Sequence, residues 1–441
     1  MNFKEKPMVA KKKKVYVCSN CGYESPKWFG RCPQCGEWNT SVELNLDEKF
    51  NSATESISLV PLTKLDEIKI LRFNSGINEL DRVLGGGIVP GSVVLIGGDP
   101  GVGKTTLMME MCSKISENET VLFVSGEESA EQIMLRAERI GIDRNDRFIV
   151  AISNELSSIL KSVEELLPKV VVIDSIQSVR MGDTIPGGIV QLRECTGRIV
   201  ELAKRKGITF FLVGHITKAG EIAGPKVLEH MVDAVLYFEG EVRTDRRILR
   251  SMKNRYGPTN ELAIFEMTDK GLKEVEDPSL TFVESGDMLA GSCVAVIVEG
   301  IRPFLVEIQA LVLKTNFGMP RRLTKGLDVN RVMMITAVMN KRLGIPLEKY
   351  DIYVNVIGGL NVRDPGVDLA VATAIYSSLI DAKIRKRTAF FGEVGLDGRV
   401  RKVFGSEKRV NEAKRAGFEN VISPDTIELE DLGDILKLVL E

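Results

Sequence analysis

The sequence predicts an α/β fold with a mainly parallel central sheet, preceded by a small cysteine-rich module and followed by an α+β domain. Three observations support this prediction. Apolar strand-like runs alternate with helical stretches in the middle of the chain. Four of the seven cysteines gather between Cys18 and Cys35, and a different pattern of strands and helices begins near residue 280.

Five runs rich in Val, Ile, Leu and Phe mark the strands of the middle block, at residues 93–97, 121–125, 170–174, 209–214 and 234–239. Nearly continuous apolar strands are typical of parallel sheets that are buried on both faces. We therefore expect an α/β domain over residues 60–275.

The last block, residues 280–441, opens with two apolar runs, 294–298 and 305–312, that a short segment joins into a predicted hairpin. Helical stretches follow at 331–343 and 367–380, with strands near 352–356 and 390–394. This order predicts an α+β domain with its own core. The polar residues 41–59 are typical of a linker between the first two blocks.

The 441 residues carry 59 basic and 61 acidic side chains, so any binding to a polyanion has to come from a local patch. A hydrophobic share of 44% and a charged share of 27% are those of a globular protein. No apolar run approaches the ~20 residues that span a bilayer, and no apolar core follows the N-terminal lysines. We therefore expect a cytoplasmic location.

The first module, residues 1–40, contains the pairs Cys18-x-x-Cys21 and Cys32-x-x-Cys35. Four thiolates satisfy a tetrahedral Zn²⁺ completely, so the predicted site is structural, and the metal would supply most of the folding free energy. A redox dithiol and a chance pattern are the alternatives, and the glycine that follows each pair favours zinc over both. The other three cysteines are predicted to be small buried apolar residues.

Aromatic and basic residues are interleaved in the same module: Trp28, Trp38, Lys27 and Arg31, after the lysines at 11–14. They form either a stacking and phosphate-binding face, or a small core of tryptophans with a solvated basic tail. The sequence leaves both interpretations open.

A nucleotide site is predicted where the strand 93–97 meets the helical stretch 106–114, because residues 98–105 match G-x-x-x-x-G-K-[ST]. The segment consists of Gly98, Asp99, Pro100, Gly101, Val102, Gly103, Lys104, Thr105 and, entering the helix, Thr106. In this motif backbone N–H groups curl around phosphates. Lys104 is expected to reach the β- and γ-phosphates of ATP, and the Thr105 hydroxyl to bind Mg²⁺.

Carboxylates follow two further strands. Asp174 ends the run 170–174, at the sheet edge where α/β proteins bind ligands, and is the expected partner of Mg²⁺ through water. Glu127 and Glu128 follow the run 121–125. Glu127 is our candidate for orienting the attacking water, whereas Glu128 is alternatively a charge at the N-terminus of a helix.

Four strings of residues resemble the RadA (Sms) family of bacterial DNA-repair ATPases: SGEES at 125–129, GHITKAGEIAG at 214–224, LEHMVD at 228–233 and KNRYG at 253–257. The resemblance covers essentially the whole chain. It implies a RecA-like core, a four-cysteine zinc finger and a Lon-protease-like C-terminal domain. It also implies a hexamer that acts on single-stranded and branched DNA, as a DNA-stimulated helicase or branch-migration motor beside a recombinase filament.

The KNRYG string comprises Lys253, Asn254, Arg255, Tyr256 and Gly257. The family's usual aromatic residue is Phe, and Tyr256 adds only a hydroxyl. In a ring, Lys253 and Arg255 are expected to reach the γ-phosphate of the neighbouring subunit, where an arginine finger is worth on the order of 10³ to 10⁵ in rate. A plain solvated turn is the alternative.

Two glycine-containing segments, 181–191 and 218–226, occupy the positions of the DNA-contacting loops of RecA-like proteins. His215 is expected to sense the γ-phosphate. The residues expected to grip DNA phosphates there are Arg180, Arg193, Lys218 and Lys226.

The stretches 358–368 and 391–400 resemble the Lon protease domain. The active protease has a serine in the segment that corresponds to Pro365-Gly366-Val367-Asp368, where this chain has none. Without that hydroxyl no acyl intermediate forms, whatever Lys408 does. We expect a role in assembly, with DNA contact at basic clusters that are each alternatively a solvated face: Arg321, Arg322 and Lys325, residues 385–387, and residues 399–402.

The predicted function is a DNA-dependent ATPase of recombinational repair that works as a ring-shaped translocase. A RecA-like autokinase or signalling switch, as in clock proteins with a similar core, is the main alternative, and Lon-like proteolysis is a third. ATP turnover that rises with single-stranded DNA would distinguish the translocase from the autokinase or signalling switch.

Overall fold

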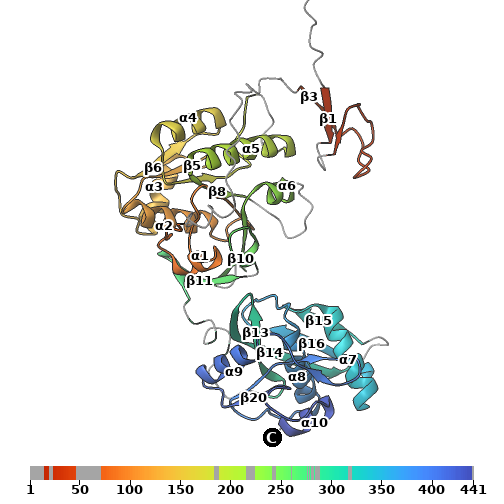
Figure 1. Cartoon of the computed structure of the whole chain (residues 1–441). Helices are drawn as coiled ribbons and strands as arrows, with labels where there is room; N and C mark the ends of the chain where they lie inside the picture. The colour runs from red at the N-terminus through yellow and green to blue at the C-terminus, as the bar shows by residue number, and fades with distance from the viewer. Residues whose placement is uncertain are drawn as a thin grey trace, which may run out of the picture. The chain divides into compact units, whose positions relative to one another are not determined.

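The protein is described by a computed structural model over residues 14–18, 23–45, 71–182, 188–214, 224–240, 245–259, 261–275, 277, 279, 283, 289–315 and 320–439. Its elements are drawn in Figure 1. The chain folds into two compact units. One comprises Met1–Glu239, Ser251–Pro258 and Asp269–Leu272, and the other Gly240–Arg250, Thr259–Thr268 and Lys273–Glu441.

The N-terminal module contains a small antiparallel sheet in the order β2-β1-β3 (β1 Lys14–Cys18, β2 Glu24–Ser25, β3 Ser41–Asn45). Tyr23 and Phe29 meet edge to face with ring centroids 5.8 Å apart. Trp28 and Trp38 are instead 62% and 67% exposed. Because both indole rings are mostly exposed, the interpretation in which the tryptophans pack a small core is wrong. The aromatic contact in this module is between Tyr23 and Phe29 instead.

A nine-stranded sheet forms the centre of the predicted α/β domain, in the order β12-β11-β10-β9-β4-β8-β7-β5-β6. The run from β9 to β6 is parallel, as predicted. Its strands are β4 (Val93–Gly98), β5 (Val121–Ser125), β6 (Phe148–Ile152), β7 (Val170–Asp174), β8 (Thr209–Val213) and β9 (Ala234–Glu239). The sequence pattern did not predict β6, which is an edge strand and only partly buried. β10 (Arg246–Asn254) and β11 (Leu262–Thr268) are antiparallel, and β12 is Gly271–Glu274.

Helices cover this sheet on both faces, which explains why its central strands are apolar throughout. The helices are α1 (Asn78–Val83), α2 (Lys104–Ser116), α3 (Ala130–Arg139), α4 (Leu156–Leu166), α5 (Ile189–Lys206) and α6 (Gly224–Met231). Val93 and Leu95 of β4 pack in one cluster with buried residues of α4 and α5. Residues 189–191, predicted to be loop, instead form the first turn of α5, and Gln191 is buried.

The second unit has a six-stranded sheet in the order β15-β16-β14-β13-β17-β20. The predicted hairpin is formed by β13 (Ser292–Glu299) and β14 (Arg302–Lys314). The other strands are β15 (Arg322–Lys325), β16 (Tyr350–Val356), β17 (Thr388–Phe390) and β20 (Asn420–Ile422), beside a small pair of β18 (Glu393–Val394) and β19 (Val400–Arg401). One face packs on α7 (Val329–Leu343), α8 (Asp368–Ile380) and α10 (Leu432–Val439), and the other on α9 (Ser406–Arg415). No helix in the described ranges is long and apolar enough to cross a membrane.

Two buried ion pairs lie in the region that resembles the protease site. Arg409, 1% exposed, donates to Asp364 over 2.6 and 3.1 Å and to the Val296 carbonyl over 2.6 Å. Asp368 is bound by the Arg331 guanidinium, with one contact at 2.9 Å. Lys408, the lysine that we considered as a base, is exposed on the outer side of α9.

Arg409→Met should lower the stability of the second unit by about 3–5 kcal/mol, since it leaves the Asp364 carboxylate buried without its cation. The expected drop in melting temperature is about 10 °C. Lys408→Met, one residue away and exposed, is the matched control and should change little. Equal melting temperatures for the two variants would show that the pair does not stabilise the fold.

Candidate functional site

The phosphate cradle lies between β4 and α2, where the sequence predicts it. Gly101 and Gly103 have φ values of +77° and +112°, which residues with a side chain rarely adopt. These values allow the loop to turn its N–H groups inward. No side chain of the described residues caps the start of α2, and its first turn has no acidic residue. The positive end of the helix is therefore available to an anion.

Lys104 is 4% exposed, and its ammonium donates to the carbonyls of Gly98 at 2.8 Å and Asp99 at 2.9 Å. Burial lowers the pKa of Lys104, and the nearby carboxylates of Asp174, Asp99 and Glu127 only partly offset this effect. An incoming phosphate would supply the missing negative charge and replace these weaker carbonyl contacts.

The Thr105 hydroxyl lies 2.5 Å from an oxygen of Asp174, at the end of β7. A hydroxyl and a carboxylate are the hard oxygen donors that Mg²⁺ prefers, so this pair fits a Mg²⁺ ion bound with ATP. The ion would neutralise charge on the β- and γ-phosphates.

Glu127 and Glu128 have different surroundings. A carboxylate oxygen of Glu127 accepts a hydrogen bond from the Ser175 hydroxyl, next to the strand end that carries Asp174. Glu128 forms an ion pair with Arg136 of α3. Ser129 and Gln132 form the capping box of that helix, so its N-terminus does not depend on Glu128. The contacts therefore favour Glu127 over Glu128 for orienting water.

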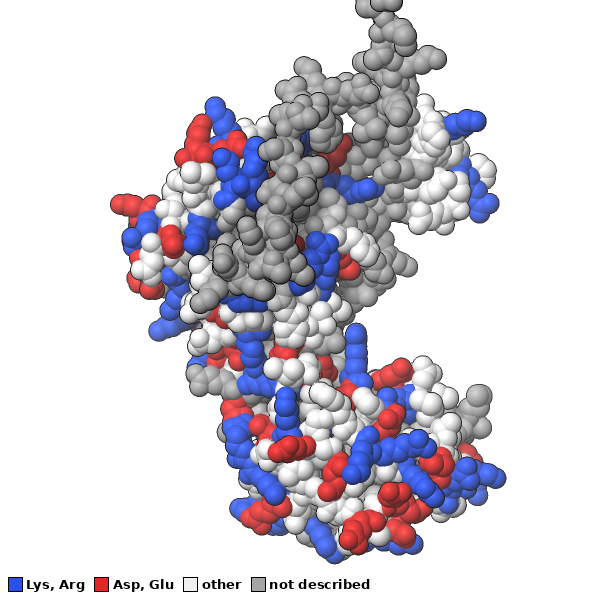
Figure 2. Space-filling view, in the orientation of Figure 1, with Lys and Arg blue, Asp and Glu red and all other residues white. Residues whose placement is uncertain are grey.

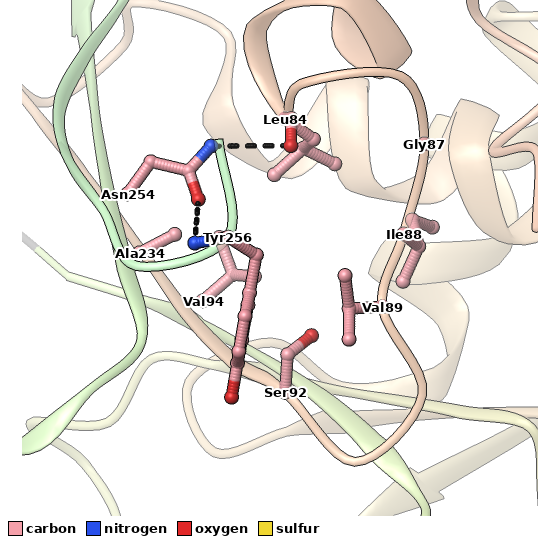
Figure 3. A pocket seen from close by; sticks show the side chains of 9 residues that line it. All are labelled: Leu84, Gly87, Ile88, Val89, Ser92, Val94, Ala234, Asn254 and Tyr256. Carbon is pink, nitrogen blue, oxygen red and sulfur yellow. Dashed lines mark hydrogen bonds between the residues drawn. The ribbon is translucent and has the colours of Figure 1, made fainter. Parts of the chain in front are cut away.

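The KNRYG turn lies at the other end of β4. Asn254 fastens it, because its amide donates to the Leu84 carbonyl at 3.1 Å and accepts from the Tyr256 N–H at 2.9 Å (Figure 3). A Cβ on Gly257 would come within 3.0 Å of the Gly85 Cα, so this approach requires glycine. The cavity beside Tyr256 measures about 10 Å³, room for about one water molecule, and is not a ligand pocket.

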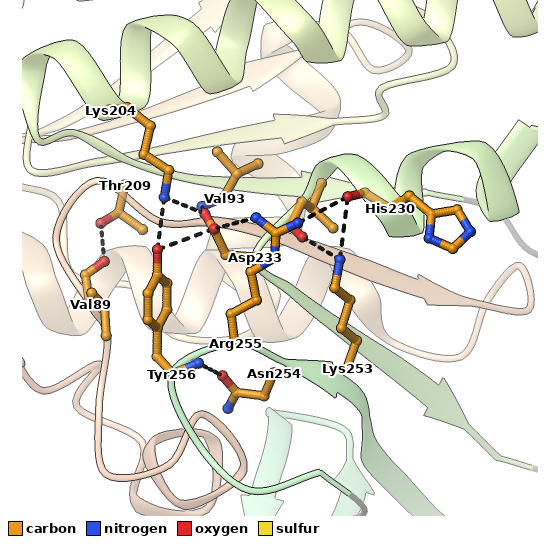
Figure 4. Close-up of polar contacts among 11 residues, drawn as sticks. Val89, Val93, Lys204, Thr209, His230, Asp233, Lys253, Asn254, Arg255 and Tyr256 are labelled. Atoms are coloured by element: carbon orange, nitrogen blue, oxygen red, sulfur yellow. Dashed lines mark hydrogen bonds and ion pairs between the residues drawn. The ribbon is translucent and has the colours of Figure 1, made fainter. Parts of the chain in front are cut away.

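The two cations of the turn fold back onto their own chain (Figure 4). The Lys253 ammonium donates to the carbonyls of Glu229 at 2.6 Å and Val232 at 2.9 Å, around the C-terminal end of α6. Arg255 donates to the His230 carbonyl at 3.2 Å, and its guanidinium remains 52% exposed. Lys253 does not reach out of the chain in this structure, and Arg255 is the more accessible of the two.

Three of the four predicted zinc ligands come together in the N-terminal module. The sulfur atoms of Cys18, Cys32 and Cys35 lie within 4.8 Å of one another, and those of Cys18 and Cys35 are 3.7 Å apart. Sulfurs around one tetrahedral zinc ion are separated by about 3.8 Å when each Zn–S bond is about 2.3 Å. The spacing therefore fits zinc. Cys21 lies outside the described residues.

Three segments of the chain match known domain families. Residues 16–43 match the rubredoxin metal binding domain, residues 60–221 the AAA domain, and residues 317–427 the subunit ChlI of Mg-chelatase. The DNA repair protein RadA of Bacillus subtilis is 46% identical over 428 residues, which cover 94% of this chain and 93% of that protein. The chain belongs to the RadA family. RadA of Listeria monocytogenes is 44% identical and covers 98% of this chain and 99% of its own.

Among solved structures, a KaiC-like protein of Pyrococcus horikoshii is 24% identical with a TM-score of 0.41, and the match covers 47% of this chain and all of the other. This similarity is too low to support an argument. RadA membership, the AAA match and the sheet order together confirm the predicted fold class: a RecA-like P-loop ATPase core with a zinc ribbon and a C-terminal domain of the ChlI type.

His215, the predicted γ-phosphate sensor, and Lys218, a predicted DNA contact, lie outside the described residues, as does the side chain of Lys226 at the start of α6. Arg180 is described, with its guanidinium 3.9 Å from Glu155. Arg193 is exposed on α5.

Several residues of the basic clusters in the C-terminal domain are paired within the chain. Arg387 pairs with Glu419, Arg401 with Asp397 and Lys402 with Asp425. Arg322 donates to the carbonyls of Tyr350 and Leu347. On the face shown in Figure 2, acidic and basic side chains are intermixed over this domain. For the paired residues, these contacts favour the interpretation as solvated faces.

Sequence reasoning missed three polar residues that the RadA fold brings to these sites: Ser175, Lys204 and Asp233. Ser175 directly follows the strand-end carboxylate, which is a local signal. Asp233 ends the string LEHMVD, but nothing nearby in the sequence links it to Lys204, 29 positions earlier.

Cys32→Ser should abolish zinc binding by this chain, because a three-thiolate remainder binds the metal far more weakly than four thiolates. Zinc content measured on the purified protein should fall from about one ion per chain to near zero. Cys112→Ala, which removes a buried thiol from α2, is the control and should keep its zinc. Unchanged metal content in the Cys32 variant would contradict the site.

Proposed function

We propose that this member of the RadA family is a DNA-stimulated ATPase that works as a ring, in which Arg255 of one copy completes the nucleotide site of the next. The position of Arg255 within its own chain carries this proposal. Asp233, which contacts Arg255, also accepts a hydrogen bond from the Val93 N–H at the first residue of β4. The phosphate cradle follows the last residue of the same strand.

The six residues of β4 span about 17 Å, farther than an arginine side chain can bridge. Arg255 therefore cannot serve the nucleotide of its own chain. An exposed cation in this position suits the phosphate of another copy, where it would stabilise transition-state charge. Lys104, Thr105, Asp174 and Glu127 supply the remaining parts of the site from one chain.

The motion that follows hydrolysis is, in this proposal, delivered to DNA. The names of the RadA relatives place them in DNA repair. Branched recombination intermediates are the proposed substrates, with a recombinase filament as partner. ATP turnover that rises with single-stranded DNA, together with strand displacement on a fork, supports a motor. Turnover indifferent to DNA, with phosphate transferred to the protein, would support the autokinase alternative.

Arg255→Ala should keep ATP binding but lower kcat by about 10³ or more, because transition-state charge is no longer neutralised. When the variant is mixed in equal amount with the unchanged protein, ATP turnover per chain should fall below about half of that of the unchanged protein, since mixed rings contain incomplete sites. Arg205→Ala, which removes an exposed arginine from the end of α5, is the control. Lys104→Ala alone should lose hydrolysis, because every cradle then lacks its lysine. Normal turnover of the Arg255 variant at saturating DNA would refute the proposed finger.

We further propose that the zinc ribbon binds single-stranded DNA through its exposed tryptophans. Both indole rings flank Gly30, whose Cβ would lie 3.3 Å from the Trp28 ring and 4.0 Å from the Trp38 ring. The Arg31 guanidinium lies 5.9 Å from the Trp38 centroid. Exposed aromatic faces beside a cation stack with the bases of single-stranded DNA whatever the sequence.

Trp38→Ala should weaken binding of single-stranded DNA by about tenfold, as expected for the loss of one stacked base. Fluorescence anisotropy with a labelled oligonucleotide measures the change. Trp38→Phe keeps an aromatic face and should recover much of the affinity, while unchanged zinc content shows that the module is folded. Equal affinities for the Ala variant and the unchanged protein would exclude this contact.

A further inference from the structure

Asp233 is a buried carboxylate that contacts two cations. It lies between α6 and β9 and is 2% exposed. One of its oxygens accepts hydrogen bonds from the Val93 N–H at 2.9 Å and the Lys204 ammonium at 2.7 Å. The other accepts from the Tyr256 hydroxyl at 3.2 Å and lies 3.6 Å from the guanidinium of Arg255 (Figure 4).

The two cations are held unequally. Lys204 lies within hydrogen-bonding distance of Asp233, whereas 3.6 Å is too long for a hydrogen bond and leaves Arg255 with Coulomb attraction alone. Burial lowers the pKa of Lys204, but its hydrogen bonds with Asp233 and Tyr256 outweigh this effect and the net pKa is raised. Lys204 therefore stays charged and is the closer counter-ion of the carboxylate.

The Tyr256 hydroxyl strengthens this arrangement. It accepts from the Lys204 ammonium at 2.9 Å and donates to Asp233, on the oxygen that faces Arg255. The ammonium also lies 5.4 Å from the centroid of the Tyr256 ring, within range of a cation–π interaction. From the motif alone, the Tyr256 hydroxyl has no evident role. In the structure it donates to the Asp233 oxygen that Arg255 would otherwise bind more closely.

We propose that Asp233 is the resting counter-ion of Arg255, and that Lys204 and Tyr256 weaken its hold so that the guanidinium can leave for a neighbouring nucleotide. Asp233, Lys204 and Tyr256 are then positioning residues, which act through Arg255. The consequence for turnover rests on the proposed function, but the resting contact does not. An ion pair with one exposed partner changes the equilibrium between Arg255 bound to Asp233 and Arg255 released by up to about fivefold.

A double-mutant cycle on the full chain, without nucleotide or DNA, tests the resting contact. Arg255→Gln should barely change the melting temperature of the ATPase unit when Lys204 is present. In the Lys204→Met background Arg255 is the one cation of the described residues still within ion-pair distance of Asp233, and Arg255→Gln should lower the melting temperature by about 2 °C more. Lys206→Met, an exposed lysine in the same last turn of α5, is the matched background and should show no coupling.

Tyr256→Phe provides a second background that keeps the packing of the ring. It should show coupling of the same sign and smaller size, because only one competing hydrogen bond is lost. Equal effects of Arg255→Gln with and without Lys204, and with and without the Tyr256 hydroxyl, would overturn the proposal whatever the protein's activity.

ATP turnover without DNA tests the consequence. Lys204→Met should lower kcat by about threefold to fivefold with an unchanged KM for ATP, and the deficit should shrink between about 50 and 300 mM salt, where screening weakens the Arg255–Asp233 pair. An unchanged kcat would show that this hold does not limit turnover. If the melting cycle shows coupling but Arg255→Ala hydrolyses ATP normally, the resting contact stands and the action of Arg255 on a neighbour fails.

Discussion

Strand β4 constrains the chemistry of this protein more than any other element. It lies between β8 and β9 in a parallel ladder, and its six residues are all buried. A strand held on both sides by main-chain hydrogen bonds cannot shift its register without exposing its apolar side chains. Its last residue begins the phosphate cradle, and its first binds Asp233. The length of one buried strand thus separates Lys104 from Arg255 of the same chain.

The charged groups at both ends of β4 are partly satisfied within the chain. Lys104 rests on two loop carbonyls, Lys253 on the end of α6, and Arg255 on one carbonyl and a distant carboxylate. Carbonyl contacts are weaker than contacts with phosphate, because a carbonyl oxygen presents only a dipole to the cation whereas a phosphate oxygen carries a negative charge. A nucleotide that brings phosphates to these cations would therefore displace the resting contacts at modest cost.

The second unit shows another use of buried charge. Arg409 and Asp364 are almost fully buried. Arg409 of α9 donates to the Val296 carbonyl of β13, and Asp364 accepts from the N–H groups of Val298 in β13 and Gly366 in the turn before α8. Such a pair contributes little net stability compared with apolar residues of similar size, although removing one partner is costly. These contacts lie at the place where the Lon resemblance would put a catalytic serine.

Much of the fold was determined by the sequence alone, because the relevant signals are local. The continuous runs of β4, β5, β7, β8 and β9, the glycines before Lys104 and the carboxylate that ends β7 each lie within a few neighbouring positions. β6 was missed because an edge strand is only half buried and lacks a continuous apolar run. Only the tertiary structure decided that the tryptophans of the zinc module are exposed, that Lys253 folds back onto α6, and that Asp233, Lys204 and Tyr256 meet. Those contacts join residues more than 20 positions apart, and side-chain partners at such a separation depend on how helices pack on the sheet, which no local pattern encodes.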